Sequence, residues 1–390
     1  HSFMTSQPSP SEEFHTSHVV TITGGHFTHD TFTAFLAPLL PALIEKLSLN
    51  FSQAGSLSAF MQMPAVITPL IGYLDDRVNL RLLLILAPAI TASTMSLMGL
   101  APTYSALALL LIITGLSSGI FHATAPALAA RISGRQVGKG MSFFMAGGEL
   151  GRTLGPLIAT WAFTTWALEG MARLLLLGWV FSLVMYLRFR NIPLHSSKPS
   201  AVSGFRQVLP AALRLFIPMT LLVFARSFII NSMGIYIPTL LKGQGADIWL
   251  ASGALTIYQM AGVAGALGGG TVSDRLGRKP VLLAVSLIAP LLVLAFLRTQ
   301  GWLMVLVLIL TGLLSLAGQP IIMAWVQDYL PQHRSIGNSL YMAVSFVALS
   351  AASILIGVLA DHFGMQQAFY WSAIIGLAAI PAVLLMPTKR

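Results

Sequence analysis

Long apolar segments alternate with short polar or Pro- and Gly-rich breaks along the whole chain. A helix that crosses a bilayer needs about 20 predominantly apolar residues, and the short alternating segments of a membrane β-barrel are not seen. The pattern therefore predicts an all-α membrane protein with twelve transmembrane helices. The twelve segments lie at 18–44, 54–74, 82–101, 104–130, 138–164, 171–189, 215–240, 248–270, 280–298, 301–327, 338–360 and 367–386.

The twelve segments fall into two sets of six that echo each other. Residues 72–77 parallel residues 270–275 at an offset of 198, and residues 40–43 parallel residues 237–240 at an offset of 197. Two matches at nearly the same offset indicate a duplicated six-helix unit. We therefore predict two pseudo-symmetric six-helix bundles, which is a common build for secondary transporters with the substrate between the halves.

A polar connection separates the two sets and defines the expected domains. Residues 191–214 form the longest polar stretch between helices and are predicted to be a cytoplasmic linker between bundles at 18–190 and 215–390. Residues 1–17 are polar and are expected to form a disordered cytoplasmic N-terminus. The three residues before Met4 have the character of a cloning remnant.

The composition restricts the class of protein further. Of the 390 residues, 56% are hydrophobic and only 9% are charged, whereas a soluble domain carries roughly 25% charged residues. Cysteine is absent, which excludes disulfides and thiol nucleophiles. No P-loop motif and no soluble domain is seen in the sequence, which disfavours an enzyme or a receptor. We expect no cofactor. Without an ATP-binding loop, energy must come from an ion gradient or from the substrate gradient, and protons are favoured over sodium.

The basic residues indicate the orientation in the membrane. The net charge is +10, and most of the 22 Lys and Arg fall in the loops that share a side with both chain ends. Basic loops stay in the cytoplasm, so both termini are predicted to be cytoplasmic in a multi-pass protein of the cell (inner) membrane. The charge then reflects membrane topology, and we expect no nucleic-acid partner.

One loop motif points to a family. Residues 270–279, GTVSDRLGRK, resemble the signature that members of the major facilitator superfamily carry between the second and third helices of each half. The copy at 72–81 has Val78-Asn79-Leu80 where the signature expects a glycine. The resemblance implies ion pairs that hold helix ends in one conformation and break in the other. The implied switch residues are Gly72, Asp76, Arg77, Arg81, Gly270, Asp274, Arg275 and Arg278.

A narrower resemblance is spread over the chain. The segments His26-Phe-Thr-His29-Asp30, Gly115 to His122 and Arg226-Ser227 are similar to elements of the fosmidomycin-resistance group of this superfamily. The group often has Pro-Glu after the fourth-helix histidine, whereas Ala-Thr follows His122 here. The resemblance implies proton-driven export of small, often anionic or drug-like molecules and hence drug resistance.

The first predicted helix carries ionisable residues at mid-membrane depth. His26 and Asp30 are four residues apart and share a face, with His29 close by. Intramembrane ionisable groups are costly and point to function, and a carboxylate beside imidazoles suits a proton relay. A static hydrogen-bonded cluster is the alternative. A metal site from these three residues lacks an evident further ligand, so no metal is predicted.

The fifth predicted helix combines a glycine stripe with two charges. Gly147, Gly151 and Gly155 form a stripe for close helix packing. Glu149 and Arg152 are three residues apart and can pair. Either the pair is structural, or protonation of Glu149 frees Arg152 to bind an anion.

Arg226 in the seventh predicted helix has no acidic residue within one turn. Its partner must come from Asp30, Glu149 or an anionic substrate, and the equivalence of the first and seventh helices favours Asp30. An arginine fork suits a carboxylate or phosphonate. His122, Asn231, Tyr236 and Gln259 are further candidates for a polar cavity.

We therefore predict a monomeric proton-coupled antiporter that exports a small organic molecule by alternating access. Asp30, Glu149, His26 and His29 would bind protons, while Arg226, Arg152, His122, Asn231, Tyr236 and Gln259 would bind substrate. The alternative is a proton symporter that imports an organic acid or a metal chelate. The partners are the substrate, protons and the lipid bilayer.

Overall fold

A computed structural model describes residues 13–67, 70–71, 80–192, 205–330 and 334–387. Gly72, Asp76 and Arg77, together with much of the predicted N-terminus and linker, lie outside these ranges. Within them the regular elements are all helical, as the sequence pattern predicts.

Two series of helices follow one another along the chain. The first comprises α1 (Thr16–Thr33), α2 (Leu36–Leu47), α3 (Phe51–Gln62), α5 (Arg81–Ser96), α6 (Tyr104–Ile132), α7 (Val137–Gly170) and α8 (Leu175–Phe189), with short 3-10 helices at Met63–Ile67, Met98–Leu100 and Met171–Leu174. The second comprises α9 (Phe205–Ile235), α10 (Ile237–Gly243), α11 (Ile248–Leu276), α12 (Arg278–Phe296), α13 (Gly301–Tyr329), α14 (Arg334–Phe363), α15 (Met365–Gly376) and α16 (Ala379–Leu385).

These helices correspond to the twelve predicted spans. Nine helical segments of the described chain are long and apolar enough to cross a membrane, and one of them, Val137–Phe189, contains 53 residues. Its backbone leaves the helical region at Ala167 (φ 57°, ψ 179°), so it holds two spans. The remaining two spans are α1 with α2 and α3 with the following 3-10 helix. The prediction of an all-α, twelve-helix membrane fold is confirmed.

Prolines explain why the first and seventh spans are broken. Proline has no N–H to donate to the carbonyl four residues earlier. Pro38 therefore leaves the Ala34 carbonyl without its helical bond, at the point where α1 gives way to α2. Pro238 lies in the first turn of α10, directly after the break that ends α9. The two breaks lie about one helical turn apart when the halves are matched at the offset of 197, which pairs Pro238 with Pro41 inside α2.

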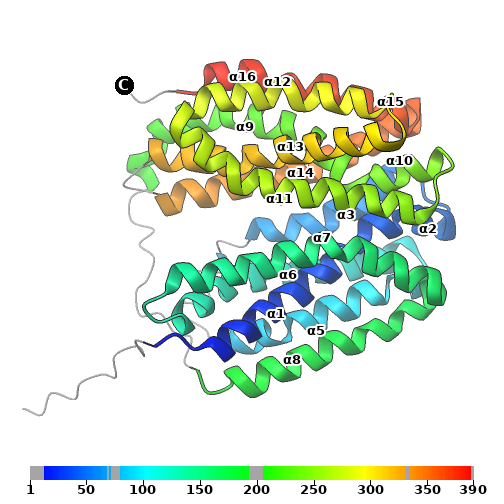
Figure 1. Ribbon diagram of the computed structural model, residues 1–390, viewed down its shortest axis with the longest axis vertical. Helices are drawn as coiled ribbons and strands as arrows, with labels where there is room; N and C mark the ends of the chain where they lie inside the picture. Colours follow the sequence, from blue (N-terminus) through cyan, green and yellow to red (C-terminus); the bar gives the residue numbers. More distant parts are fainter. Residues whose placement is uncertain (1–12, 68–69, 72–79, 193–204, 331–333, 388–390) are drawn as a thin grey trace, which may run out of the picture.

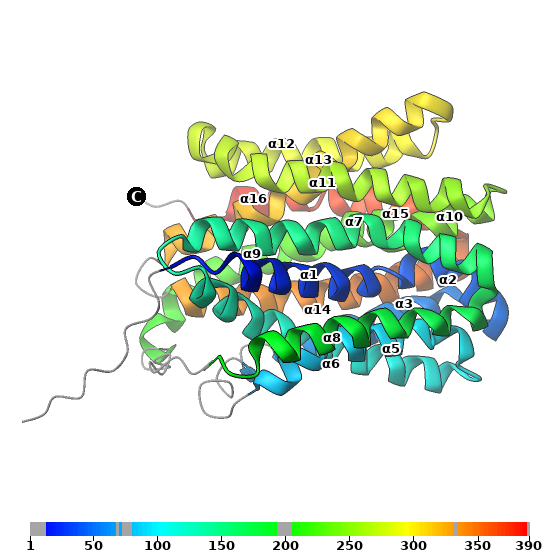
Figure 2. The ribbon, with the colours of Figure 1, turned by 60° about the horizontal axis from the view of Figure 1, so that its bottom comes forward.

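The helices form two layers of roughly parallel rods (Figure 1), one from each half. α1 begins and α16 ends at the same end of the molecule, on the left of Figure 1. In both views α7 lies between α1 and α11 (Figure 2), and it packs against both. α14 packs against α3 in the same way. These helix pairs, α7 with α11 and α3 with α14, bring the two halves together.

The halves share a core at one end only. One buried cluster contains side chains of both halves, including Leu40 and Phe35 beside Ile237 and Tyr258. Two further clusters each belong to a single half, one around Phe144 and Phe189 and one around Trp325 and its neighbours on α9 and α13. These separate cores lie toward the end where the chain begins and finishes. The halves therefore join at the end away from the termini.

Hydrogen bonds between the halves gather at that joined end. The Asp361 carboxylate, near the end of α14, accepts from the backbone N–H groups of Phe51 (2.6 Å) and Ser52 (2.9 Å) and from the Ser52 hydroxyl. It thus caps the N-terminus of α3 in the other half, where a carboxylate is favoured. Ser353 donates to the Gly55 carbonyl at 3.0 Å.

Candidate functional site

The buried Asp30 carboxylate is the centre of a charged cluster built by three helices of the first half. His26 on α1 places Nε2 at 3.3 Å from Oδ2 of Asp30, as the four-residue spacing predicts. His122 on α6 places Nε2 at 3.5 Å from Oδ1, and Arg152 on α7 places Nε at 3.5 Å from Oδ2. Arg152 also forms an ion pair with Glu149. We call these five residues the Asp30 cluster.

Close packing of α7 on α1 brings the cluster together. Cβ atoms at Gly147, Gly151 or Gly155 would clash with the backbone of α1, so the predicted glycine stripe is the contact surface. Gly148 faces the His26 ring, which a Cβ at that position would overlap. Small residues let helix backbones approach closely, and here they allow charged groups on α7 to reach a carboxylate on α1.

The hydrogen bonds of the two histidines define where protons lie. Nδ1 of His26 is 2.8 Å from the Phe144 carbonyl, and Nδ1 of His122 is 2.9 Å from the Ser118 carbonyl. A carbonyl oxygen only accepts, so each Nδ1 carries a proton and each Nε2 faces the carboxylate. A hydrogen bond between Nε2 and Asp30 then needs one more proton, on the imidazole or on the carboxyl group. The geometry is suited to binding and releasing protons.

The cluster has a buried base and an exposed edge. Asp30 is 2% exposed and His26 is 3% exposed. In contrast, the side chains of Arg152 and His122 are 50% and 42% exposed. Protons and ligands can therefore reach the carboxylate through His122 and Arg152. Donor atoms of His26, Asp30 and His122 lie within 4.8 Å of one another, but Arg152 already places a positive charge beside the same carboxylate, which opposes binding of a metal cation there.

His29 lies beside the Asp30 cluster, with its ring centroid 5.6 Å from that of His122. It is fully buried, its ring stacks on Phe121 with centroids 4.6 Å apart, and Nδ1 lies 3.0 Å from the Thr91 hydroxyl. The Thr91 hydroxyl in turn donates a hydrogen bond to the Ser117 hydroxyl at 3.1 Å. His29 makes no ion pair with Asp30, so a part in proton transfer stays a prediction.

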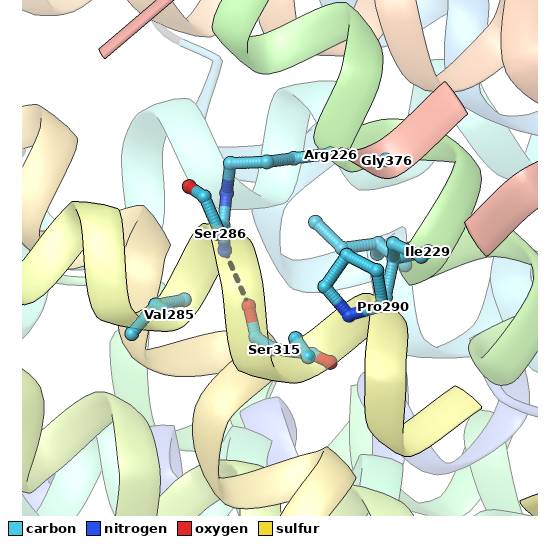
Figure 3. A pocket seen from close by; sticks show the side chains of 9 residues that line it. Arg226, Ile229, Val285, Ser286, Pro290, Ser315 and Gly376 are labelled. Atoms are coloured by element: carbon cyan, nitrogen blue, oxygen red, sulfur yellow. Dashed lines mark hydrogen bonds between the residues drawn. The ribbon is translucent and has the colours of Figure 1, made fainter. Parts of the chain in front are cut away.

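Arg226 on α9 points into the interior of the second half (Figure 3). Its Nη2 donates to the Ser315 carbonyl of α13 at 2.6 Å, and the side chain is 6% exposed. The expected contact with Asp30 is not formed. The offset of 197 residues that relates the halves pairs Arg226 with His29, one position before Asp30. One residue is about 100° of helix rotation, so Arg226, like His29, faces inside its own bundle.

The other predicted substrate ligands are placed differently from one another. Asn231 donates to the Leu349 carbonyl at 2.5 Å, and the Tyr236 hydroxyl donates to the Ser353 carbonyl at 2.7 Å. Both are buried and have hydrogen-bond partners. Gln259 is partly exposed, and its Oε1 makes no hydrogen bond within the described residues. Of the three, Gln259 thus has a buried side-chain oxygen without a partner in the described part of the chain.

The switch residues in the described part of the chain lie at the end of the molecule where α1 begins, and some of them form ion pairs or hydrogen bonds there. Arg278 bridges Asp274 (2.5 Å) on α11 and Asp328 (3.2 Å) on α13. Gly277 adopts φ 93°, which explains the glycine between α11 and α12. Gly270 has no neighbour within 4 Å of a Cβ built there, so it does not serve a close helix approach in this conformation. Arg81 donates to the Ile192 carbonyl at 2.9 Å, and Arg275 is exposed.

Two acidic residues at helix ends were missed as functional candidates. Asp328 completes the Arg278 contact, and Asp361 joins the two halves. Asp361 lies in the segment Gly357-Val-Leu-Ala-Asp361-His-Phe-Gly364, a general pattern of the superfamily. That pattern was the only signal in the sequence, because the partner of Asp361 is a backbone helix end, which leaves no side-chain pattern.

Comparisons with known proteins agree with this architecture. The sequence model of the Major Facilitator Superfamily matches residues 22–297 and 250–390. The fosmidomycin resistance protein of Escherichia coli (strain K12) is 25% identical over 377 residues, which cover 94% of this chain and 91% of that protein.

Solved structures show the same fold. A mutant of the nucleoside transporter NupG aligns with a TM-score of 0.78 at 15% identity, over 95% of this chain and 99% of that one. A D-xylose-proton symporter aligns with a TM-score of 0.73 at 17% identity, over 96% and 97% of the two chains. With the family match spanning nearly all of the twelve-helix fold, the chain belongs to the major facilitator superfamily of multi-pass membrane transporters.

Proposed function

We propose that this transporter exports a small, drug-like organic molecule in exchange for protons. The observation that carries the proposal is the geometry of the Asp30 cluster, in which two imidazoles and an arginine meet one buried carboxylate. Similarity to the fosmidomycin resistance protein supports export. The protein would act as a monomer in the cell (inner) membrane, with both termini in the cytoplasm.

The charges of the cluster supply a coupling step. With Asp30 and Glu149 ionised, Arg152 is held by two carboxylates. A basic group on the substrate would bind these carboxylates only while they are ionised, so proton uptake by Asp30 would release it and couple export to proton entry. His122 and Gln259 offer further polar contacts, while substrate contacts of Arg226, Asn231 and Tyr236 would need a different conformation.

The position of the joined end predicts from which side of the membrane the substrate can enter the site. The halves share a core at the end away from the termini, and basic loops predict that this end faces outward. The structure would then be the inward-facing state, in which an exporter takes up its substrate from the cytoplasm.

One observation favours the alternative, a proton symporter that imports an organic acid. Arg152 contacts the same carboxylate that takes up the proton. For an anionic substrate, protonation of Asp30 strengthens binding to Arg152, so proton and anion bind together. For a substrate with a basic group, proton and substrate compete for Asp30 and Glu149, which is the requirement for antiport. The sign of coupling therefore depends on substrate charge.

Proton flux in proteoliposomes tests the proposal. Vesicles loaded with a pH-sensitive dye would receive fosmidomycin or a lipophilic cation such as ethidium, with wild type, Asp30→Asn and a control. Asp247→Asn is a matched control, because Asp247 only caps α11 by accepting from Leu250 N–H, and asparagine caps equally well. We expect proton movement opposite in direction to ethidium in wild type and Asp247→Asn, whereas protons that move together with fosmidomycin would favour the symport alternative. Equal flux in Asp30→Asn would show that the cluster is structural.

A further inference from the structure

Arg226 is a buried charge that lacks a counter-charge. Within the described residues no carboxylate lies within 4 Å of its guanidinium, whose hydrogen bond goes to the neutral Ser315 carbonyl. A buried charge is very costly unless a partner neutralises it. The absence of a side chain at Gly318 makes room for the guanidinium of Arg226, because a Cβ at residue 318 would overlap it. Because the guanidinium is buried and positively charged, we expect a negatively charged partner beside it.

A cavity lies beside the guanidinium, entirely within the second half. Its wall includes Arg226 and Ile229 from α9, Ser286 and Pro290 from α12 and Ser315 from α13 (Figure 3). The nearby ring of Pro290 and the aliphatic side chains make most of the surface apolar. The cavity has room for about one water-sized particle. An organic substrate is too large for it in this conformation.

Apart from the Ser315 carbonyl that accepts from Arg226, the polar side chains that line the cavity can donate hydrogen bonds. The hydroxyls of Ser286 and Ser315 are buried, and neither makes a hydrogen bond within the described residues. Hydroxyl hydrogens rotate to suit their partner. One fixed positive charge and the serine O–H donors make a site for an anion.

We propose that this cavity binds a small inorganic anion of the chloride class, which neutralises Arg226 and is not the transported substrate. The anion would receive hydrogen bonds from the guanidinium and from the serine hydroxyls, while the apolar wall excludes larger or more hydrated ions. This proposal is independent of the proposed function, because it assigns an ion to the second half and leaves the Asp30 cluster untouched.

Thermal unfolding of the purified full chain tests the proposal. The midpoint Tm would be measured in sodium chloride, sodium bromide and sodium gluconate at equal ionic strength. A ligand that binds only the folded state raises Tm in a saturable way. We expect a rise of a few degrees in chloride and bromide over gluconate, which is too large for the cavity, and loss of that rise in Arg226→Met.

Serine variants keep the test decisive if Arg226→Met does not fold. Ser286→Ala removes a hydroxyl that has no protein partner among the described residues, so it should fold and should need a several-fold higher chloride concentration for half of the effect. Ser372→Ala is the matched control, because its buried hydroxyl bonds the Ala368 carbonyl of its own helix. Equal Tm values of wild type in all three salts, or an unchanged chloride requirement in Ser286→Ala, would overturn the proposal.

Two further readouts separate the anion from water and from substrate. Crystals grown in bromide should show an anomalous signal beside Arg226, whereas a water molecule gives none. Fosmidomycin should leave the chloride dependence of Tm unchanged. Competition between fosmidomycin and chloride would place Arg226 in the substrate site and contradict the proposal.

Discussion

The two halves of this transporter treat buried charge in opposite ways. In the first half, Asp30 meets His26, His122 and Arg152 from three helices, and the cluster has an exposed edge. In the second half, Arg226 meets a carbonyl and unpaired hydroxyls in a closed interior. A duplicated scaffold has thus kept its helices and changed its chemistry. The first half gathers titratable side chains around one carboxylate, whereas the second holds a permanent positive charge.

Replacing Asp30 should produce the largest effect on this contrast. An amide cannot take up a proton, so Asp30→Asn should lower substrate-coupled proton flux by about 100-fold or more, measured in dye-loaded proteoliposomes. Arg226→Met should leave the proton stoichiometry of the remaining transport unchanged. If the two variants lose proton coupling to the same extent, both halves take part in proton coupling, and the proposed difference between them is wrong.

Two glycines allow each charged site to be disturbed without changing the other. Gly148 makes room for His26, and Gly318 makes room for Arg226. Each alanine variant should lose about 1–3 kcal/mol of stability through overpacking, measured by thermal or chemical unfolding. Gly148→Ala should also impair proton coupling, while Gly318→Ala should impair the chloride effect on Tm.

Gly253→Ala is the control for both glycine variants. A Cβ at Gly253 on α11 meets nothing within 4 Å, and alanine favours a helix over glycine. Its stability should therefore be equal or slightly higher. A loss of coupling in Gly318→Ala would mean that the two charged sites are linked.

Replacing Asp361, which joins the two halves, should have a smaller effect on stability than the glycine substitutions within each half. Asp361→Ala removes the acceptors of the Phe51 and Ser52 N–H groups but leaves the Asn50 cap of α3 in place. It should destabilise the joined end by about 1 kcal/mol, measured as greater labelling of a cysteine introduced near Gly55. Asp361→Asn retains a capping oxygen and should lie closer to wild type. Unchanged labelling in Asp361→Ala would show that the apolar core alone holds this end.

The smallest effect on stability should come from Glu149. It is partly exposed and pairs with a half-exposed arginine, so Glu149→Gln should cost about 0–1 kcal/mol. Its effect on transport distinguishes the two interpretations of the pair. Normal proton coupling in this variant supports a structural ion pair, and lost coupling makes Glu149 a second proton site.

The sequence predicted contacts within a helix better than contacts between helices. The spacings of His26 with Asp30 and of Glu149 with Arg152 gave their contacts directly, because helical geometry places such residues on one face. The meeting of His122 and Arg152 at Asp30 depends on how three helices rotate about their axes, which the glycine stripe of α7 helps to set. The contact with Asp30 that the sequence favoured for Arg226 is not formed, because the two residues differ by one position in the equivalent helices.

The core that both halves share at one end also limits how fast the protein can work. A carrier must separate that core, together with the Asp361 contact, in every cycle. Contacts of similar strength between the halves must form at the opposite end, or the equilibrium would remain on one side. Substitutions that tighten either end should therefore yield a more heat-resistant protein with a lower turnover number. For this fold, maximal stability and maximal turnover are competing properties.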